Sequence, residues 1–160
     1  HLYRHENIQA AEAVRKALAL APGYADGMSL LAQIENYSGR PERAIELIEE
    51  AIIVNPLYSW DYLFNLGWAH YTLGEYRKAV KYLTLALERN QYATYARLVL
   101  AASHVALEQY GDAEWQVDEV LSYHTNMSIR FLKQQTPIDL SNDRIQQYLA
   151  DLRAAGIPDD

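Results

Sequence analysis

The sequence predicts an all-α fold, a solenoid of paired helices, and three observations indicate it. Apolar residues recur at helical spacing, and no stretch shows the alternation with a period of two that a strand requires. The chain also repeats itself about every 34 residues, a period typical of stacked helix pairs. Glycine and proline fall where the predicted helices turn or end.

The repeat is clearest at small residues. In the second predicted helix of each unit they correspond as Ala10 and Ala17, Ala44 and Ala51, Ala79 and Ala86, and Ala113 and Val120. The first helices carry a small residue at Ala32, Gly67 and Ala101. We therefore expect Gly67 to face its paired helix closely, although glycine inside a helix costs roughly 1 kcal/mol relative to alanine.

The repeat divides the chain into an incomplete unit, three full helix pairs and an extension. The predicted segments are 1–24 (the second helix of an incomplete pair), 25–59, 60–93, 94–127 and 128–160. In the clearest pair the helices are predicted at about Trp60–Thr72 and Tyr76–Arg89, with Gly74 in the turn between them. Because the chain opens inside a helical pattern without a methionine, we expect a piece of a longer protein.

The extension is predicted to end in one more helix, at about Asn142–Ala155, with Ser141 as N-cap and Gly156 as its stop. Its apolar face consists of Ile145, Tyr148, Leu149 and Leu152. We expect this helix to cap the array, since the last repeat otherwise leaves an apolar face exposed. The alternative is that the extension folds into the concave groove and occupies it.

The repeat unit resembles the tetratricopeptide repeat. The resemblance covers residues 7 to 126, and its motif is carried by Leu66, Gly67, Tyr71, Gly74, Tyr76, Ala79, Ala86 and Leu87. It implies a right-handed superhelix of about three and a half repeats with a C-terminal capping helix. This chain departs from the family pattern at Gln91 and Thr125 (the terminal proline), at Glu108 (the turn glycine), and at His70 and His104 (a core tyrosine).

The extension carries a second resemblance. Its end, Leu152-Arg-Ala-Ala-Gly-Ile-Pro-Asp159, is similar to the C-terminus of bacterial proteins that join tetratricopeptide repeats to an upstream effector domain. In those families the effector is a class III adenylate or guanylate cyclase, or the winged-helix domain of a transcriptional regulator. The resemblance does not distinguish the two effectors.

The family resemblance implies that the first helix of each pair lines a concave groove where ligands bind. The candidate groove residues are Gln33, Asn36, Asp61, Phe64, Trp68, Tyr71, Tyr95, Leu98, Ala102 and Val105. One end of this stripe is polar and the remainder is aromatic and apolar, as expected of a surface that takes a partner or an internal cover. We expect a protein or peptide there, and the alternatives are the chain's own tail or another subunit. The stripe has no lysine or arginine, which argues against a clamp for a terminal carboxylate.

Composition excludes several function classes. The 160 residues have a formal net charge of −7 and no cysteine, which argues against nucleic-acid binding, disulfides and cysteine metal sites. No apolar run is long enough to span a bilayer, and the predicted location is the cytoplasm. His70, His104 and Glu35 share one repeat position, but equivalent points on packed helices lie too far apart to share a metal. His1 and His5 show no ligand spacing, and no catalytic motif or cofactor site is present.

The sequence therefore predicts a non-catalytic protein-interaction module, the C-terminal regulatory or scaffolding part of a larger bacterial signalling protein. The alternative is an oligomerisation module that holds two copies together as a homodimer, so that an upstream cyclase or DNA-binding domain can dimerise.

Overall fold

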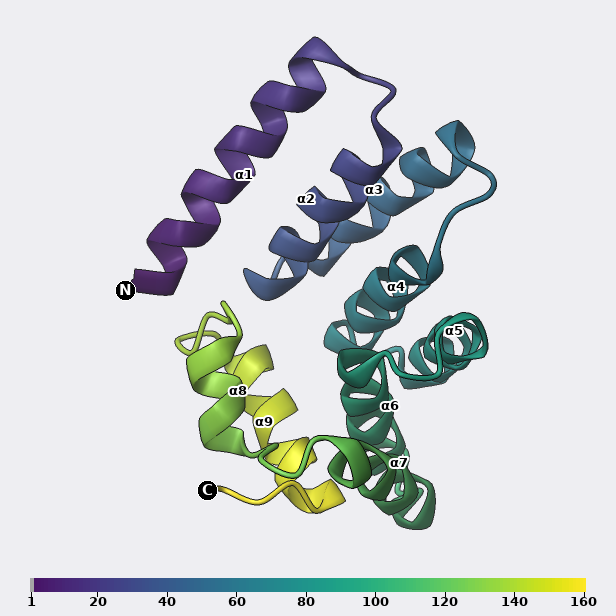
Figure 1. Cartoon of the computed structure of the whole chain (residues 1–160), viewed down its shortest axis with the longest axis vertical. Coiled ribbons are helices and arrows are strands. Elements are labelled where there is room, and N and C mark those ends of the chain that lie inside the picture. Colours follow the sequence, from purple (N-terminus) through teal and green to yellow (C-terminus); the bar gives the residue numbers. More distant parts are fainter. Residues whose placement is uncertain (1) are drawn as a thin grey trace.

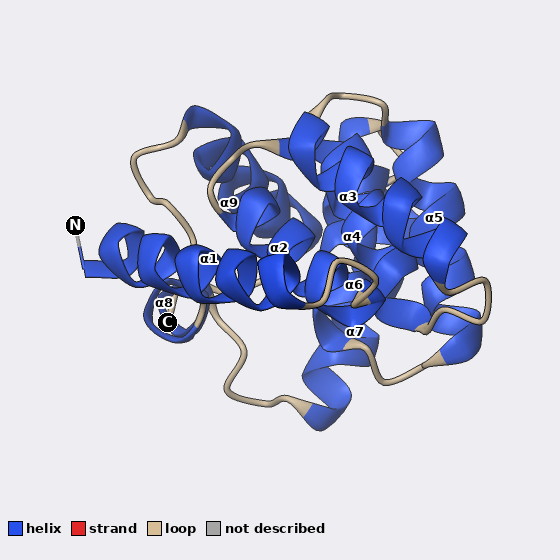
Figure 2. Cartoon of the chain, turned by 90° about the horizontal axis from the view of Figure 1, so that it is seen from above, coloured by secondary structure: helices blue, strands red, loops and turns tan. Residues whose placement is uncertain are grey.

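The computed structural model describes the backbone of residues 2–160 and the side chains of residues 8–160, so His1 and His5 lie outside the described side chains. Within these residues the chain forms helices and no strand (Figure 2). The helices are α1 (Leu2–Leu20), α2 (Ala25–Tyr37), α3 (Pro41–Val54), α4 (Trp60–Thr72), α5 (Tyr76–Arg89), α6 (Thr94–Ala106), α7 (Tyr110–Tyr123), α8 (Ile129–Gln135) and α9 (Asp143–Ala155).

The helices stack as antiparallel pairs, α2 with α3, α4 with α5 and α6 with α7, and α1 packs on α2 ahead of them. Each second helix also packs on the first helix of the next pair, and α2, α4 and α6 touch one another in succession. Figure 1 shows the pairs following one another, while α8 and α9 return along the side that α2, α4 and α6 form. The predicted bounds Trp60–Thr72 and Tyr76–Arg89 are confirmed by α4 and α5.

The turn inside each pair has the same construction three times. The first helix ends in a Schellman motif, with Gly39, Gly74 and Glu108 in the left-handed region at φ 71°, 78° and 60°. The next backbone N–H then bonds to the carbonyl five residues back, for example Glu75 N to His70 O at 2.9 Å. The turn therefore satisfies the last carbonyls of the first helix before the second helix begins.

The residue that ends each turn also folds its side chain back onto the first helix. Nδ1 of His70 lies 2.5 Å from Glu75 Oε2, and Nδ1 of His104 lies 2.8 Å from Gln109 Oε1. In the first pair the equivalent contact is the ion pair of Glu35 with Arg40. The shared position of Glu35, His70 and His104 is thus explained by a turn contact within each pair.

Glu108 is the one non-glycine residue with positive φ in the described part of the chain. We expect Glu108→Gly to raise the free energy of unfolding by about 0.5–1 kcal/mol, because relief of left-handed strain exceeds the added entropy of the unfolded chain. Urea unfolding followed by circular dichroism measures this. Gly74→Ala, at φ 78°, is the matched control and should lower stability by about 1 kcal/mol. A Glu108→Gly chain less stable than wild type would contradict the explanation.

The extension differs in detail from the sequence prediction. The N-cap of α9 is Asn142, whose side chain accepts a hydrogen bond from Arg144 N at 2.9 Å, so the predicted N-cap Ser141 is wrong by one residue. The Ser141 hydroxyl instead donates to Asp139, at 2.6 Å. Gly156 stops the helix at φ 114°, as predicted. The apolar stretch after Ser128 forms the short helix α8, which the sequence did not predict.

Candidate binding groove

The apolar part of the predicted groove is covered by α9. Phe64, Trp68 and Tyr71 of α4 are buried, as are Leu98, Ala102 and Val105 of α6. The helix α9 packs mainly on α6 and touches α7 through fewer residues. The expectation that this stripe faces solvent is therefore wrong, and the arrangement kept as the alternative, with the extension in the groove, is the one observed. Tyr95 remains half-buried at the edge.

An aromatic cluster joins α9 to the groove. The ring of Trp68 lies 5.3 Å from that of Tyr148 on α9, 5.2 Å from Tyr37 and 5.6 Å from Phe64. The last two contacts are edge-to-face, a favourable geometry for aromatic pairs. Tyr148 also meets Tyr71 edge-to-face at 5.9 Å. Tyr148 therefore fills the centre of the groove, in contact with two of its predicted contact residues.

A buried carboxylate lies beside this cluster. The Tyr71 hydroxyl donates to Asp151 Oδ2 at 2.5 Å, and Gln147 Nε2 donates to Asp151 Oδ1 at 2.8 Å. Asp151 is only 7% exposed, and its described contacts include no cation. Burial raises the pKa of Tyr71 far above its ordinary value, and the neighbouring carboxylate adds to the shift. Burial likewise raises the pKa of Tyr37 to about 12.

The Tyr148 hydroxyl is different, because it is buried without a hydrogen-bond partner. Burial raises its pKa well above the ordinary value, and no described side chain offsets the loss of hydration. Of the two tyrosines that meet where α9 packs, Tyr71 therefore has a hydrogen-bonded hydroxyl and Tyr148 has one without a partner.

These two tyrosines should respond oppositely to loss of the hydroxyl. We expect Tyr148→Phe to raise the free energy of unfolding by about 1 kcal/mol, because it removes an unpaired buried polar group. Tyr71→Phe should lower it by about 1.5 kcal/mol, because the buried Asp151 carboxylate then loses the hydrogen bond that the Tyr71 hydroxyl donates to it. Urea titrations of both variants measure the difference. Equal signs would contradict the assignment of these hydrogen bonds.

Residues 128–160, here called the tail unit, are joined to one another by hydrogen bonds and share one apolar core with the repeats. The chain end is tied to the start of α8 by hydrogen bonds from Ile129 N to Pro158 O at 2.8 Å and from Arg130 N to Asp159 O at 3.0 Å. Arg153 on α9 donates to Asp159 at 2.7 Å. Towards the repeats, Asp139 N donates to Tyr37 O at 3.2 Å. The tail unit therefore joins α8, α9 and the C-terminus into one piece that sits over the groove.

The polar end of the predicted groove has a structural role. Asn36 Nδ2 donates to Asn65 O at 3.0 Å, and Ser29 Oγ donates to Asp61 Oδ2 at 2.7 Å. These bonds tie α2 to α4, and Asn36 is buried, so it does not face a ligand. Gln33 is half-buried and donates to the Tyr37 hydroxyl at 3.2 Å. Gln33 and Asp61 retain exposed surface at this end.

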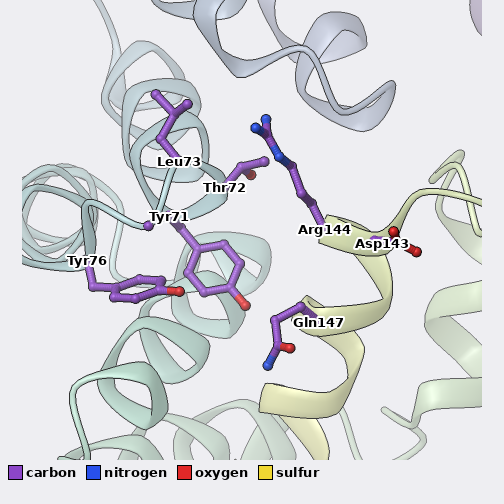
Figure 3. A pocket seen from close by; sticks show the side chains of 8 residues that line it. Tyr71, Thr72, Leu73, Tyr76, Asp143, Arg144 and Gln147 are labelled. Atoms are coloured by element: carbon purple, nitrogen blue, oxygen red, sulfur yellow. The ribbon is translucent and has the colours of Figure 1, made fainter.

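An opening remains beside α9, where the groove is not filled (Figure 3). Its volume is about 330 Å³, and it is lined by α4, the following turn, the start of α5 and α9. Figure 3 shows the Tyr71 and Tyr76 rings on one side and Arg144 and Gln147 of α9 on the other. Asp143 and Arg144 balance each other in charge, so the opening favours no ion; it marks where α9 borders solvent.

The described side chains contain no cluster of three or more His, Cys, Asp or Glu that could hold a metal ion. Among the described helices, none is both long and apolar enough to cross a membrane. The groove is accordingly the site with the strongest structural support.

Sequence reasoning missed two participants in this site. Tyr37 lies one turn beyond Gln33 on α2, and its spacing could have placed it on the groove stripe. Asp151 gave no such signal, because a carboxylate three residues after Tyr148 looks like an ordinary polar position of an amphipathic helix.

Comparison with known proteins identifies the repeat. The sequence profile described as tetratricopeptide repeat matches residues 1–59, 29–93 and 64–121, which together span most of the chain. The chain belongs to the tetratricopeptide repeat family. No curated protein matches this sequence.

Solved structures agree with the tetratricopeptide repeat fold. The structure of MamA has a TM-score of 0.64 at 18% identity and covers 95% of this chain and 90% of MamA. PilF of Pseudomonas aeruginosa gives 0.66 at 21%, covering 97% and 71%. YrrB, described as a TPR protein with an unusual peptide-binding site, gives 0.59 at 20%, covering 94% and 77%. At these identities the likeness shows the fold alone, and it confirms the predicted all-α tetratricopeptide solenoid.

Proposed function

We propose that this tetratricopeptide repeat chain is a non-catalytic protein-interaction module that binds partners through its concave groove, with α9 as an intramolecular occupant. The observation that carries the proposal is that the amphipathic helix α9 packs in the groove, where its Tyr148 contacts Trp68 and Tyr71. A groove that holds one helix by its apolar face can hold another, as in other helix-in-groove complexes. YrrB, which has the same fold, is described as having an unusual peptide-binding site, and this supports a peptide-binding or protein-binding function here.

The proposed contact surface is the predicted stripe without Asn36. It consists of Phe64, Trp68, Tyr71, Tyr95, Leu98, Ala102 and Val105, with Gln33 and Asp61 at the polar end. Aromatic side chains dominate such hot spots because they bury large areas at a small entropic cost. Since α9 covers most of this surface, a partner has to displace it.

The test compares capture by chains in which the tail unit is weakened. Immobilised full chains of wild type and Leu152→Ala are exposed to an extract of the source organism, and bound proteins are identified by mass spectrometry. Leu152 is fully buried on α9, so its truncation loosens the tail unit. We expect Leu152→Ala to capture proteins that wild type leaves behind. Ile138→Ala, near the other end of α9, is a second variant that weakens the same unit.

Two controls separate groove exposure from general destabilisation. Leu47→Ala removes a leucine buried in the first full pair, away from the tail unit, and should capture nothing extra. Adding Tyr95→Ala and Trp68→Phe to Leu152→Ala should remove the captured proteins while the helical circular dichroism persists. Equal capture by Leu47→Ala and Leu152→Ala would contradict the proposed surface.

A second candidate function, holding two copies together, is favoured by the exposed face of α1. Ala10 and Ala17 are exposed, whereas the equivalent residues of α3, α5 and α7 have no exposed surface because the first helix of their pair covers them. Such small side chains would let α1 of a second copy approach closely. Light scattering tests this, since the dimer has twice the 18.3 kDa chain mass and Ala17→Glu should dissociate it. A strict monomer at tens of micromolar contradicts it.

The resemblance of the tail sequence supports a wider proposal about context. We propose that the module is the regulatory or scaffolding part of a bacterial signalling protein of the cytoplasm, with a cyclase or winged-helix effector upstream. Its support is the sequence from Leu152 to Asp159. The coding sequence of the full-length gene product tests this directly, and an upstream region without either domain contradicts it.

A further inference from the structure

We propose that the groove binds an amphipathic helix of a partner protein, with the same apolar pattern as α9. At two positions the partner fits better than α9: an aromatic residue without a hydroxyl replaces Tyr148, and an uncharged hydrogen-bond acceptor replaces Asp151. The inference rests on the proposed function and names the chemistry of the partner. It is carried by the contacts of α9 itself, which serves as the template.

The template is set by the buried face of α9. Ile145, Tyr148, Leu149 and Leu152 are all buried, at the spacing of one helical face. The groove therefore takes aliphatic side chains at the positions of Ile145, Leu149 and Leu152, and a ring at that of Tyr148. A partner helix has to supply the same face, because α9 packs on α6 and, through Tyr148, on Trp68 and Tyr71 of α4.

The ring position is imperfectly filled by α9. The Tyr148 ring meets Trp68 and Tyr71, but its hydroxyl is buried with no partner. A phenylalanine keeps the ring contacts and avoids the unsatisfied hydroxyl. The groove thus favours phenylalanine over the residue that its own tail supplies.

The acceptor position is also imperfectly filled. The Tyr71 hydroxyl donates at 2.5 Å to one oxygen of Asp151, and Gln147 Nε2 donates at 2.8 Å to the other. The carboxylate is nevertheless only 7% exposed, and its described contacts include no cation. An unpaired buried charge is costly, whereas the hydroxyl requires only an acceptor. Asparagine supplies an acceptor without the charge, and leucine would leave the Tyr71 hydroxyl unpaired. The groove therefore selects an amide three residues after the ring.

The tail unit can leave the groove without α8 and α9 separating from each other. Its internal hydrogen bonds join Ile129 and Arg130 to the chain end, so α8 and α9 need not separate when α9 leaves the groove. It is linked to α7 by residues 124–127, where the helix has ended. When a partner displaces α9, one helix therefore replaces another in the same groove, and the repeats do not change.

Peptide binding tests the pattern. Three fluorescein-labelled peptides cover residues 138–158: the native sequence, one with Tyr148→Phe and Asp151→Asn, and one with Tyr148→Phe and Asp151→Leu. Each is titrated by fluorescence anisotropy against the full chain carrying Leu152→Ala, and also against Ile138→Ala. We expect the Phe/Asn peptide to bind about ten-fold more tightly than the native one. In a full chain that also carries Tyr71→Phe, the preference for asparagine over leucine should disappear.

A cysteine reporter separates failure of this inference from failure of the proposed function. The chain has no cysteine, so Ala102→Cys places a single thiol on the groove stripe of α6 and Ala51→Cys places one in the repeat core. We expect a maleimide to label Ala102→Cys at least ten-fold faster than Ala51→Cys. Equal rates mean that the groove stays closed, and both proposals are then wrong.

The remaining outcomes concern the occupant alone. Suppose that Ala102→Cys is labelled faster but no peptide binds, or all three peptides bind equally. The stated residue pattern is then wrong, whereas the proposed function still stands. If light scattering shows that the Leu152→Ala chain pairs with itself and excludes the peptides, the occupant is α9 of a second copy, and the assignment to a partner protein is overturned.

Discussion

Trp68→Ala is expected to lower the free energy of unfolding by about 3–5 kcal/mol, as for other truncations of a large buried aromatic side chain. Trp68 is 2% exposed and its ring contacts Tyr37, Phe64 and Tyr148, which belong to α2, α4 and α9. Removal of the Trp68 ring leaves a cavity where these three helices meet, and it weakens the packing of α9 in the groove. Urea unfolding followed by far-ultraviolet circular dichroism measures the loss.

Trp115→Ala is the matched control for this truncation. Trp115 is 55% exposed on α7, and the Arg97 guanidinium lies 5.6 Å from its ring centre. We expect a loss of less than about 1 kcal/mol, since an exposed cation–π contact contributes little. Similar losses for the two tryptophans would contradict the central position assigned to Trp68.

Gly67→Ala is expected to lower stability by about 2 kcal/mol, although alanine is the better helix former by about 1 kcal/mol. A Cβ atom at Gly67 would lie 2.5 Å from Leu83 Cγ and 2.7 Å from Leu83 Cδ2. Leu83 is fully buried on α5 and has little room to move. Overpacking therefore exceeds the gain in helix propensity, and thermal or urea unfolding measures the net loss.

The neighbouring repeats supply the rescue for this variant. The equivalent pairs are Ala32 with Ile48 and Ala101 with Val117, in which an alanine faces a β-branched residue. Gly67→Ala combined with Leu83→Val rebuilds the pair of the third repeat, so the double variant should be more stable than the sum of the single losses predicts. A double-mutant cycle measures this coupling, and strict additivity would contradict the close approach.

Much of the solenoid could be predicted because its signals are local. Helical periodicity, turn glycines such as Gly74, and small residues such as Gly67 each act within one pair, so a single repeat carries the information for its own helices. The repeated pattern then fixes the stacking, since every unit meets its neighbour through the same positions. Even the shared position of His70 and His104 has a local explanation, a contact with the residue five positions later.

The candidate site was only partly predictable, because its contacts join distant segments. The predicted stripe on α4 and α6 is buried under α9, and Tyr148 and Asp151 reach it from about 80 residues further along the chain. Periodicity gave α9 an apolar face but did not say which surface would receive it. The buried faces of an end cap and of a groove occupant have the same pattern, so no sequence signal separates them.

From the sequence alone, the all-α solenoid and the bounds of α4 and α5 could be predicted, because both depend on spacing within or between repeats. Only the tertiary structure decided that α9 lies in the groove, that Asn36 ties α2 to α4, and that Asp151 accepts from Tyr71. The physical reason is that burial of an apolar face is non-directional: it requires a cover but does not name one. The choice of cover follows from the shape and hydrogen-bonding groups of the assembled surface, such as Trp68 and the Tyr71 hydroxyl, which exist as a site only after the repeats have stacked.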